Sequence, residues 1–324
     1  MAITNAPAVV SIGEGQLRLT SPRGVPLAQT HEVRLEVAGT EGNVLGLLSR
    51  LGVATGLVTA LPRTALGRRV AEEWRQAGID LSRCVWRDEG RVALYFVDRG
   101  SPPVPSRVLY DRADSCFSRL STGDVDWDYI EAAELVHLTG ITASLTKGVY
   151  EVLLKAAEGA RRPGRRLSVD VNYRALLGDA DTARERLEPL MTGADVVFCS
   201  RRDAATVFGV TGPTPRVATA LAARFQVRTV VVSDGADPVA VCHEATHLAA
   251  APLPTTIIDR VGAGDALVGA FLYGILRDDP ALGLRLGIAA AALALTRHGD
   301  QLLTDLAELN WLAATAGAAG EIVR

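Results

Sequence analysis

The 324-residue sequence predicts an α/β fold in which a mostly parallel central sheet lies between two layers of helices. Two observations support this prediction. Between about residues 130 and 296, short apolar runs rich in β-branched residues alternate with longer segments of helical periodicity. The short runs are apolar almost throughout, as strands covered on both faces are. One α/β domain can account for a chain of this length, and we expect a single domain over residues 1–324.

The expected elements follow one another in chain order. Strands of the main sheet are expected at residues 9–13, 56–61, 134–140, 166–172, 194–200 and 228–235. Helices are expected at residues 43–51, 65–77, 147–160, 182–191, 215–225, 266–276 and 286–295. In the segment 266–276, Leu267, Phe271 and Ile275 recur every four residues, which places them on one helix face.

Residues 31–37 alternate polar and apolar side chains. Residues 91–97 and 107–112 are also strand-like, and the turn-forming sequence GSPPVPS separates them. Such alternation is typical of a sheet with one face in water. We therefore predict a small β flap beside the main sheet.

Composition argues against several classes of protein. Lys and Arg number 34 against 37 Asp and Glu, a net charge of −3, and aromatic residues make up 5%, so no nucleic-acid partner is expected. The longest strongly apolar stretch, 286–295, is half of the ~20 residues that a bilayer span needs. The four cysteines are widely spaced, and no signal peptide is recognisable. We expect a cytoplasmic protein without disulfides, a structural zinc site or a membrane partner.

Small or polar residues follow the expected strands at their carboxyl ends. Ligands of open α/β sheets bind at this edge, so these residues are expected to form the rim of a site. The most polar of these strand ends carries Asp170, Asn172 and Arg174.

The sequence Gly262-Ala263-Gly264-Asp265, followed by a helical segment, carries the clearest chemistry. Its backbone N–H groups and the helix N-terminus can form an anion hole, and Asp265 beside it can accept a proton from a hydroxyl. The alternative is an ordinary helix start with an acidic residue that favours the helix dipole. A Walker A motif and a GxGxxG motif are both absent from the sequence.

The segment DRVGAGD (259–265) resembles the D-x-x-G-A-G-D signature of the ribokinase-like (PfkB) carbohydrate kinases. Gly39 and Asn43, in GTEGN, resemble the family's Gly-Gly-x-x-x-Asn segment near the start of the chain. The resemblance implies a ribokinase-like three-layer αβα sandwich with a small β-sheet lid. It further implies lid segments at roughly 14–37 and 91–114 and a nucleotide-binding part at roughly 195–300.

Within the family the chain is most similar to 2-keto-3-deoxygluconate kinases. This similarity implies a set of substrate-binding residues: Gly39, Asn43, Tyr95, Tyr110, Arg112, Ile141, Arg174, Asp265 and Asp300. Arginines suit a sugar acid, because a guanidinium can bind a carboxylate through two parallel hydrogen bonds. The alternatives are a solvated flap residue for Arg112 and a structural ion pair with Asp170 for Arg174.

The same resemblance implies ATP and Mg²⁺. The nucleotide would contact Asn172, Ser200, Ser233, Gly235, Asp237, Gly262, Ala263 and Gly264. Asp170 and Asp203 would hold Mg²⁺ through water. A potassium-type site near Asp259 and residues 298–301 rests on the resemblance alone.

Three positions depart from the family pattern, and all three concern binding. Ala38 stands where the family has the first of its paired glycines. The nucleotide loop 233–238, SDGADP, lacks the usual lysine and carries two carboxylates. Ile288 stands in a helix that often contributes an asparagine near the adenine.

The sequence thus predicts an ATP-dependent kinase that phosphorylates the primary hydroxyl of a sugar acid, with 2-keto-3-deoxygluconate and its 6-phosphate as the expected pair. Two alternatives stay open. One is a kinase for a neutral sugar, such as fructose or ribose, or for a nucleoside. The other is a catalytically silent sugar-binding sensor. Exposed flap strands favour a homo-oligomer, a dimer or larger, because uncovered sheet edges tend to pair.

Overall fold

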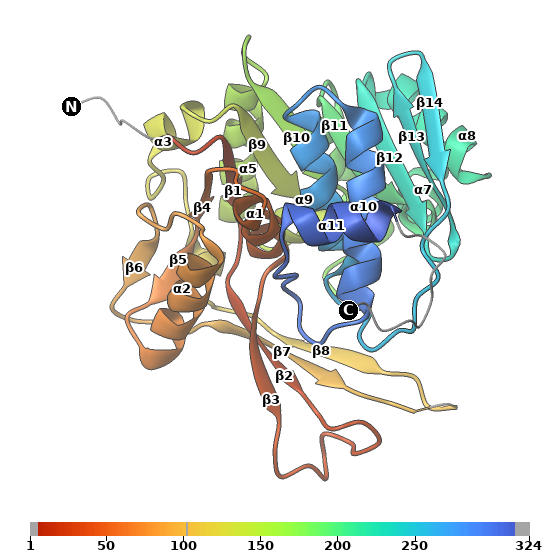
Figure 1. Ribbon diagram of the computed structural model, residues 1–324. Helices are drawn as coiled ribbons and strands as arrows, with labels where there is room; N and C mark the ends of the chain where they lie inside the picture. Colours follow the sequence, from red (N-terminus) through yellow and green to blue (C-terminus); the bar gives the residue numbers. More distant parts are fainter. Residues whose placement is uncertain (1–5, 102, 315–324) are drawn as a thin grey trace.

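The structure is a computed structural model that describes residues 6–101 and 103–314. Its centre is an eight-stranded sheet in the order β14-β13-β12-β11-β10-β9-β1-β4 (Figure 1). The strands from β12 to β4 along this order run parallel to one another, and β13 pairs antiparallel with both of its neighbours, β12 and β14. The bounds are β1 Val9–Ile12, β4 Thr55–Val58, β9 Leu135–Thr139, β10 Arg166–Asp170, β11 Val196–Ser200, β12 Thr229–Asp234, β13 Asp237–His243 and β14 Thr246–Ala250. The predicted mostly parallel sheet is confirmed.

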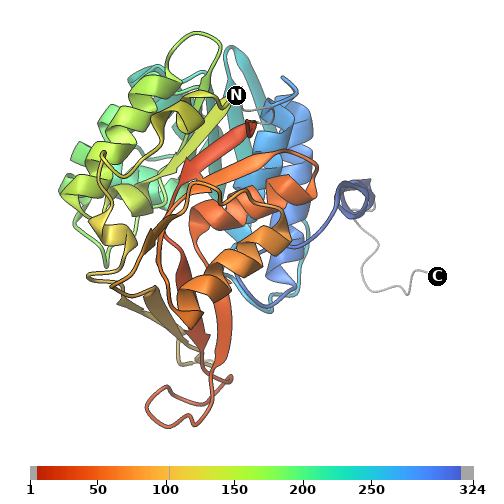
Figure 2. The same cartoon turned by 90° about the vertical axis from the view of Figure 1, so that its left-hand side faces the viewer.

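Helices cover both faces of this sheet, as Figure 2 shows from the side. The helices that pack on one face are α1 Thr40–Arg50, α2 Ala65–Ala77, α9 Ala263–Ile275, α10 Pro280–Leu295 and α11 Leu306–Ala314. Those on the other face are α3 Trp127–Glu131, α4 Gly140–Ala143, α5 Lys147–Ala160, α6 Ala180–Met191, α7 Arg201–Phe208 and α8 Thr214–Phe225, with the 3₁₀ turn Phe117–Arg119. No helix of the described residues is long and apolar enough to span a bilayer.

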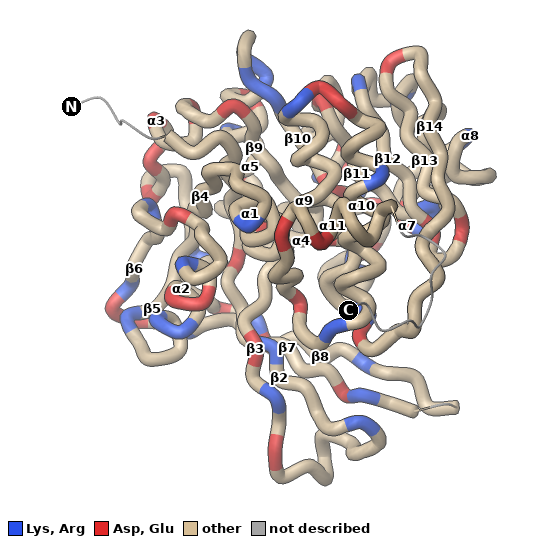
Figure 3. Tube along the Cα trace, viewed as in Figure 1, with Lys and Arg blue, Asp and Glu red and all other residues tan. Residues whose placement is uncertain are grey.

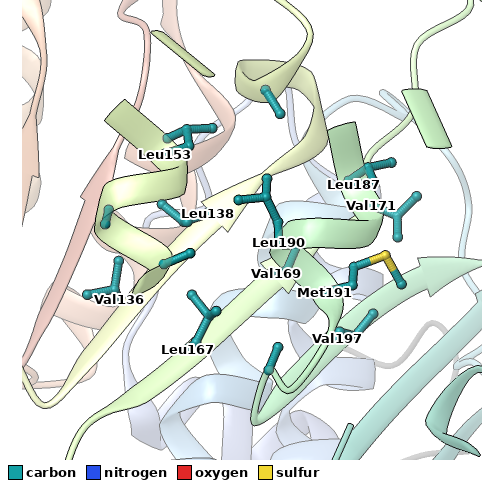
Figure 4. Packing of buried hydrophobic residues seen from close by; sticks show 14 of the residues in the cluster. Val136, Leu138, Leu153, Leu167, Val169, Val171, Leu187, Leu190, Met191 and Val197 are labelled. Atoms are coloured by element: carbon teal, nitrogen blue, oxygen red, sulfur yellow. The ribbon is translucent and has the colours of Figure 1, made fainter. Parts of the chain in front are cut away.

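The packing follows from the sequence periodicity. Leu153 of α5 and Leu190 of α6 lie over the apolar strand residues Leu138 and Val169 in Figure 4. Each helix presents one apolar stripe, and each parallel strand is apolar on both faces. One hydrophobic core therefore forms on each side of the sheet. His137 lies in this region fully buried, 3.0 Å from the Ser168 hydroxyl, and burial lowers its pKa to about 3. It is a packed core histidine.

A separate four-stranded sheet, called the small sheet here, stands below the main sheet in Figure 1. Its order is β3-β2-β7-β8, with bounds β2 Gln16–Thr20, β3 Arg34–Ala38, β7 Ala93–Asp98 and β8 Arg107–Asp111. Two hairpins, β2–β3 and β7–β8, are joined because β2 and β7 pair in parallel. The predicted flap is confirmed, with β2 as an additional strand.

One strand prediction was wrong in its extent. Residues 56–61 do not form a single strand, because the chain leaves the main sheet after β4 and continues as β5 (Ala60–Pro62). β5 pairs with β6 (Val85–Arg87) in a two-stranded sheet. The break lies at Thr59, whose carbonyl accepts a hydrogen bond from the Val85 N–H at 2.8 Å. The antiparallel hairpin β13–β14 was also not predicted.

Candidate active site

A cavity of about 820 Å³ opens at the carboxyl ends of the parallel strands. Asp170, Ser200 and Ser233, which end or follow the apolar parts of β10, β11 and β12, line one side of it. The starts of α1 and α9 and residues of the small sheet complete the lining. Strand ends, helix N-termini and the small sheet therefore converge on one space.

The start of α9 has the backbone geometry of an anion site. Gly262 precedes the helix at φ 87°, and a Cβ added to it would lie 2.1 Å from the backbone oxygen of Asp300. Only glycine fits this turn without displacing the chain. No side chain caps the helix, so the N–H groups of its first turn lack intrahelical and capping partners. Gly262 and Gly264 line the cavity, so this helix start can receive a negative charge from it.

Asp265 lies in the first turn of α9 and lines the same cavity. Its Oδ1 accepts a hydrogen bond from the Thr40 hydroxyl at 2.5 Å, and its Oδ2 accepts one from Asn43 Nδ2 at 2.7 Å. Burial raises the pKa of Asp265 to about 6, although both hydrogen bonds act in the opposite direction. A carboxylate with this pKa is unprotonated at neutral pH and still basic enough to take up a proton.

The hydrogen-bonded chain continues from Thr40 to the end of β10. Asn172, at φ 38°, donates from Nδ2 to the Thr40 hydroxyl oxygen at 3.0 Å and to Asp170 Oδ2 at 3.2 Å. Burial, and then the nearby Asp265 charge, raise the pKa of Asp170 to about 8. Thr40 was not predicted. Its signal was a hydroxyl residue three positions before Asn43, one turn along the same helix face.

The small sheet and its neighbours contribute the opposite wall. Tyr95, Tyr110, Ile141 and Asp300 line the cavity, and the two tyrosine rings are 6.2 Å apart between centroids. The Tyr95 hydroxyl donates to Asp300 Oδ2 at 2.5 Å. Asp300 is therefore already hydrogen-bonded within the protein.

The two predicted carboxylate-binding arginines have different surroundings. Arg174 is exposed, lines the cavity and donates from Nη1 to the backbone oxygen of Tyr173 at 3.2 Å. No described carboxylate lies within 4 Å of it, so the ion pair with Asp170 is not formed. Arg112 is 8% exposed and does not line the cavity.

Arg112 instead forms a buried ion pair with Glu14. Its Nε and Nη2 donate to Glu14 Oε2 at 2.9 and 2.6 Å, and Ser115 donates to Oε1 of the same carboxylate. The alternative of a solvated flap residue is wrong for Arg112. Arg112 also lies outside the cavity lining, which separates it from the other predicted substrate contacts. Its guanidinium is bound to the Glu14 carboxylate within the protein instead.

The predicted nucleotide residues are partly brought together. Ser200, Ser233 and Asn172 line the cavity, whereas Gly235, Asp237 and Ala263 do not. Arg201, at the start of α7, forms ion pairs with Asp234 and with Asp237, the latter at 3.3 Å. The two carboxylates that distinguish loop 233–238 are thus paired with one guanidinium, which offsets one of their two negative charges.

The cavity also contains cations that the sequence analysis did not single out. Arg202 and Arg260 line it and offer positive charge where the loop lacks the usual lysine. Ile288 lies outside this cavity, on a separate apolar pocket of about 280 Å³ that Leu248 and Leu253 also line.

The donor set fits a magnesium ion that is held largely by phosphate oxygens and water. Asp203 Oδ1 is buried without a hydrogen-bond partner, and it lines the cavity together with Asp170. Among the described residues, no three side chains of His, Cys, Asp or Glu form a direct metal site. Mg²⁺ prefers few carboxylates and retains water, which matches two carboxylates in an open cavity.

Comparisons with known proteins identify a family and a fold for this chain. The model of the "pfkB family carbohydrate kinase" matches residues 7–306. The chain is 34% identical over 293 residues to the 2-dehydro-3-deoxygalactonokinase of Haloferax volcanii, covering 90% of this chain and 92% of the relative. The crystal structure of 2-dehydro-3-deoxygluconokinase from Thermotoga maritima has a TM-score of 0.88 and 30% identity, covering 94% of this chain and 98% of that one. A structure from E. coli in complex with ATP and Mg²⁺ shares the fold at 20% identity, with a TM-score of 0.87 and coverage of 95% and 99%.

Proposed function

The chain belongs to the pfkB family of carbohydrate kinases, and we propose that it transfers the γ-phosphoryl group of ATP to the primary hydroxyl of a 2-keto-3-deoxy sugar acid. 2-Keto-3-deoxygluconate and its galactonate epimer are the expected substrates. The observation that carries this proposal is that two residues line the same cavity. They are Asp265, at the open start of α9, and Arg174, which has no ion-pair partner among the described residues. The first supplies a base for a hydroxyl, and the second supplies a partner for a carboxylate.

Asp265 accepts the proton of the sugar hydroxyl as that oxygen attacks the γ-phosphorus. Thr40 and Asn43 each hold one carboxylate oxygen, so the side chain keeps its orientation toward the cavity. A proton acceptor in a fixed position contributes about 10²–10⁴-fold to such a reaction.

The N–H groups at Gly262, Ala263 and Gly264 receive the negative charge of the transferring phosphoryl group. They are fixed by the turn at Gly262, so they need no reorganisation when the charge develops. Arg260 and Arg202 extend this positive region toward the nucleotide phosphates, and Ser200, Ser233 and Asn172 contact the nucleotide. Mg²⁺, held near Asp170 and Asp203, neutralises phosphate charge when bound.

Arg174 selects for the acid. Its guanidinium has donors free for a bidentate contact with a carboxylate, and it stands at the exposed edge of the cavity. Tyr95, Tyr110, Ile141, Gly39 and Asn43 contact the sugar chain, with Asp300 holding Tyr95 in position. A neutral sugar would leave Arg174 without its partner.

The residues 1–324 act as a single domain in which the segments 14–37 and 91–114 form a lid over the sugar and residues 195–300 bind the nucleotide. Closing the lid excludes water and limits the hydrolysis of ATP. Exposed Leu109 of β8 and exposed Val33, which directly precedes β3, favour a homo-oligomer built through the small sheet. The cytoplasmic location remains a prediction.

The experiment that tests the proposal is a coupled ADP-release assay with Mg-ATP. The panel holds 2-keto-3-deoxygluconate, 2-keto-3-deoxygalactonate, gluconate, fructose, ribose and adenosine, with Asp265→Asn as the blank. Preference for the two keto-deoxy acids supports the proposal, and turnover of a neutral substrate alone overturns the sugar-acid assignment. Binding of sugar without any turnover, measured by thermal stabilisation, would identify a silent sensor.

A further inference from the structure

Arg18, in the middle of β2, is completely buried. Its Nη2 donates to Oδ2 of Asp259 at 2.6 Å, and its Nη1 donates to Oδ1 of Asp300 at 2.7 Å. Its Nε donates to the Thr20 hydroxyl at 2.8 Å and lies 3.6 Å from Oε2 of Glu36. Charges are rarely buried unless they are paired, so this guanidinium and its carboxylates form one unit.

The two strongest partners of Arg18 adjoin the anion hole on both sides. Asp259 begins the segment that leads into Gly262, and its Oδ1 accepts a hydrogen bond from the Val261 N–H at 3.2 Å. The backbone oxygen of Asp300 occupies the space that a Cβ on Gly262 would need. The guanidinium therefore holds both segments that shape the turn.

The potassium-type site that the family resemblance implied does not fit these residues. A K⁺ ion needs several oxygen atoms, with lone pairs directed at it, to replace its water shell. Each carboxylate oxygen of Asp259 already gives one lone pair to a hydrogen bond, and one of the two donors is the always-charged guanidinium of Arg18. A monovalent cation at Asp259 would lie directly beside that positive charge.

We propose that Arg18 is the fixed cation of this site and that phosphoryl transfer by this chain needs no monovalent metal ion. The guanidinium takes over the two tasks of such an ion: it places a positive charge between Asp259 and Asp300, and it holds the turn of the anion hole in the shape that receives charge. Arg18 is thus a positioning residue, because it acts through these two segments. The inference concerns the family's phosphoryl transfer and does not depend on which sugar is accepted.

The first test is the cation dependence of the wild-type chain. kcat is measured with the best substrate of the panel at equal ionic strength in chloride salts of K⁺, Na⁺ and tetramethylammonium. The expected kcat values agree within about twofold, since less than 0.5 kcal/mol separates them. Activation by K⁺ of fivefold or more overturns the proposal.

The second test removes the guanidinium. Arg18→Ala is expected to lose tenfold or more in kcat in tetramethylammonium chloride and to regain fivefold or more with K⁺ or a low concentration of guanidinium chloride. A purely structural role would not create a response to small cations. Loss of activity without such recovery, in a variant that keeps a native melting transition, overturns the proposal. Arg83→Ala, which removes a half-buried ion pair with Asp126 elsewhere, is the matched control and is expected to show no cation response.

A third measurement does not depend on activity. Crystals of the wild-type chain grown with Tl⁺ are expected to show no anomalous signal at the Asp259 carboxylate, and a peak there overturns the proposal. Should Arg18→Ala fail to fold, this measurement and the wild-type cation series still decide the question. A wrong sugar-acid assignment would instead appear as a changed order within the substrate panel, with the cation ratios unaffected.

Discussion

The two walls of the cavity use charged residues in opposite ways. On the wall formed by the main sheet, α1 and α9, hydrogen bonds link Asp170, Asn172, Thr40 and Asp265 in a row along the cavity. On the side of the small sheet, Asp300 on the cavity wall and Arg112 behind it are already joined to Arg18 and Glu14, respectively, within the protein. The first wall presents hydrogen-bonding and acidic groups to a ligand, whereas most of the charged groups on the second side are engaged in ion pairs within the protein.

This difference separates two arginines that look equivalent in the sequence. Both Arg112 and Arg174 follow a strand, and both were expected to bind a carboxylate. The structure gives Arg112 an internal carboxylate and leaves Arg174 at the cavity without one. Acidic and basic positions are interspersed along the chain in Figure 3, so proximity and burial, and not sequence alone, decide which charge is free.

The largest expected effect is a loss of kcat when the base on the wall of the main sheet, α1 and α9 is removed. Asp265→Asn is expected to lower kcat by about 10³-fold, because the hydroxyl proton loses its acceptor. The measurement is ADP release under saturating substrates, with circular dichroism to check the fold. Asp111→Asn, an exposed acid that pairs with Arg91 on the small sheet, is the control and should retain activity. Near-normal kcat in Asp265→Asn would refute the assignment of the base.

The next largest effect is a loss of stability when the ion pair between Arg112 and Glu14 is broken. Arg112→Leu is expected to cost about 3–5 kcal/mol in the free energy of unfolding, because Glu14 is left buried and unpaired. Urea unfolding measures it, and adding Glu14→Leu should recover much of the loss. An unchanged stability together with a tenfold rise in the KM for the sugar acid would contradict this comparison and would show that Arg112 binds the substrate.

A smaller effect sharpens the contrast between the two arginines. Arg174→Gln is expected to raise the KM for a keto-deoxy acid by about 10–100-fold, the loss of one charged hydrogen-bonded contact. Its stability should change by less than about 0.5 kcal/mol, as is usual for an exposed residue. Arg202→Gln, an exposed cation on the nucleotide side, is the matched variant and should raise the KM for ATP instead. Equal effects on both substrates in both variants would be inconsistent with separate roles.

The smallest effect is the pH dependence of the base. The pKa of Asp265 is raised to about 6, and the residue must be unprotonated to accept the hydroxyl proton. The value of kcat/KM is therefore expected to be level above about pH 7, to be about half of that level near pH 6, and to fall about tenfold per pH unit well below it. A pH–rate profile between pH 5 and 8 measures this, in buffers where the melting temperature is constant. A rate that rises on acidification would exclude Asp265 as the base.

Local patterns predicted the fold well, and they singled out motif-bearing residues that the structure brings to one cavity. Apolar runs, helical stripes and the turn glycines carry their information within about ten residues, so the parallel sheet and the start of α9 could be found in the sequence. Asp265 and Asn43 were found together for the same reason, since each stands in a short segment with a distinctive composition.

Pairings between distant segments could not be predicted. Arg18 was not singled out in the sequence, and only Asp259 and Asp300, 241 and 282 residues away, explain why it is buried. Glu14 with Arg112 and Arg201 with Asp237 are similar cases, 98 and 36 residues apart in the first and second pair respectively. No sequence window contains both partners of such a pair.

The position of β1 has a consequence for how the chain is made. This strand lies between β4 and β9, and Ser11 donates to the carbonyl of His137, 126 residues later. At about 5–20 residues per second, the ribosome needs about 6–25 seconds to produce that second neighbour. For this time one edge of a buried strand has no partner, and folding of the sheet from its first strand outward cannot be completed during early synthesis. A fragment that ends before β9 would keep that edge open and is expected to aggregate.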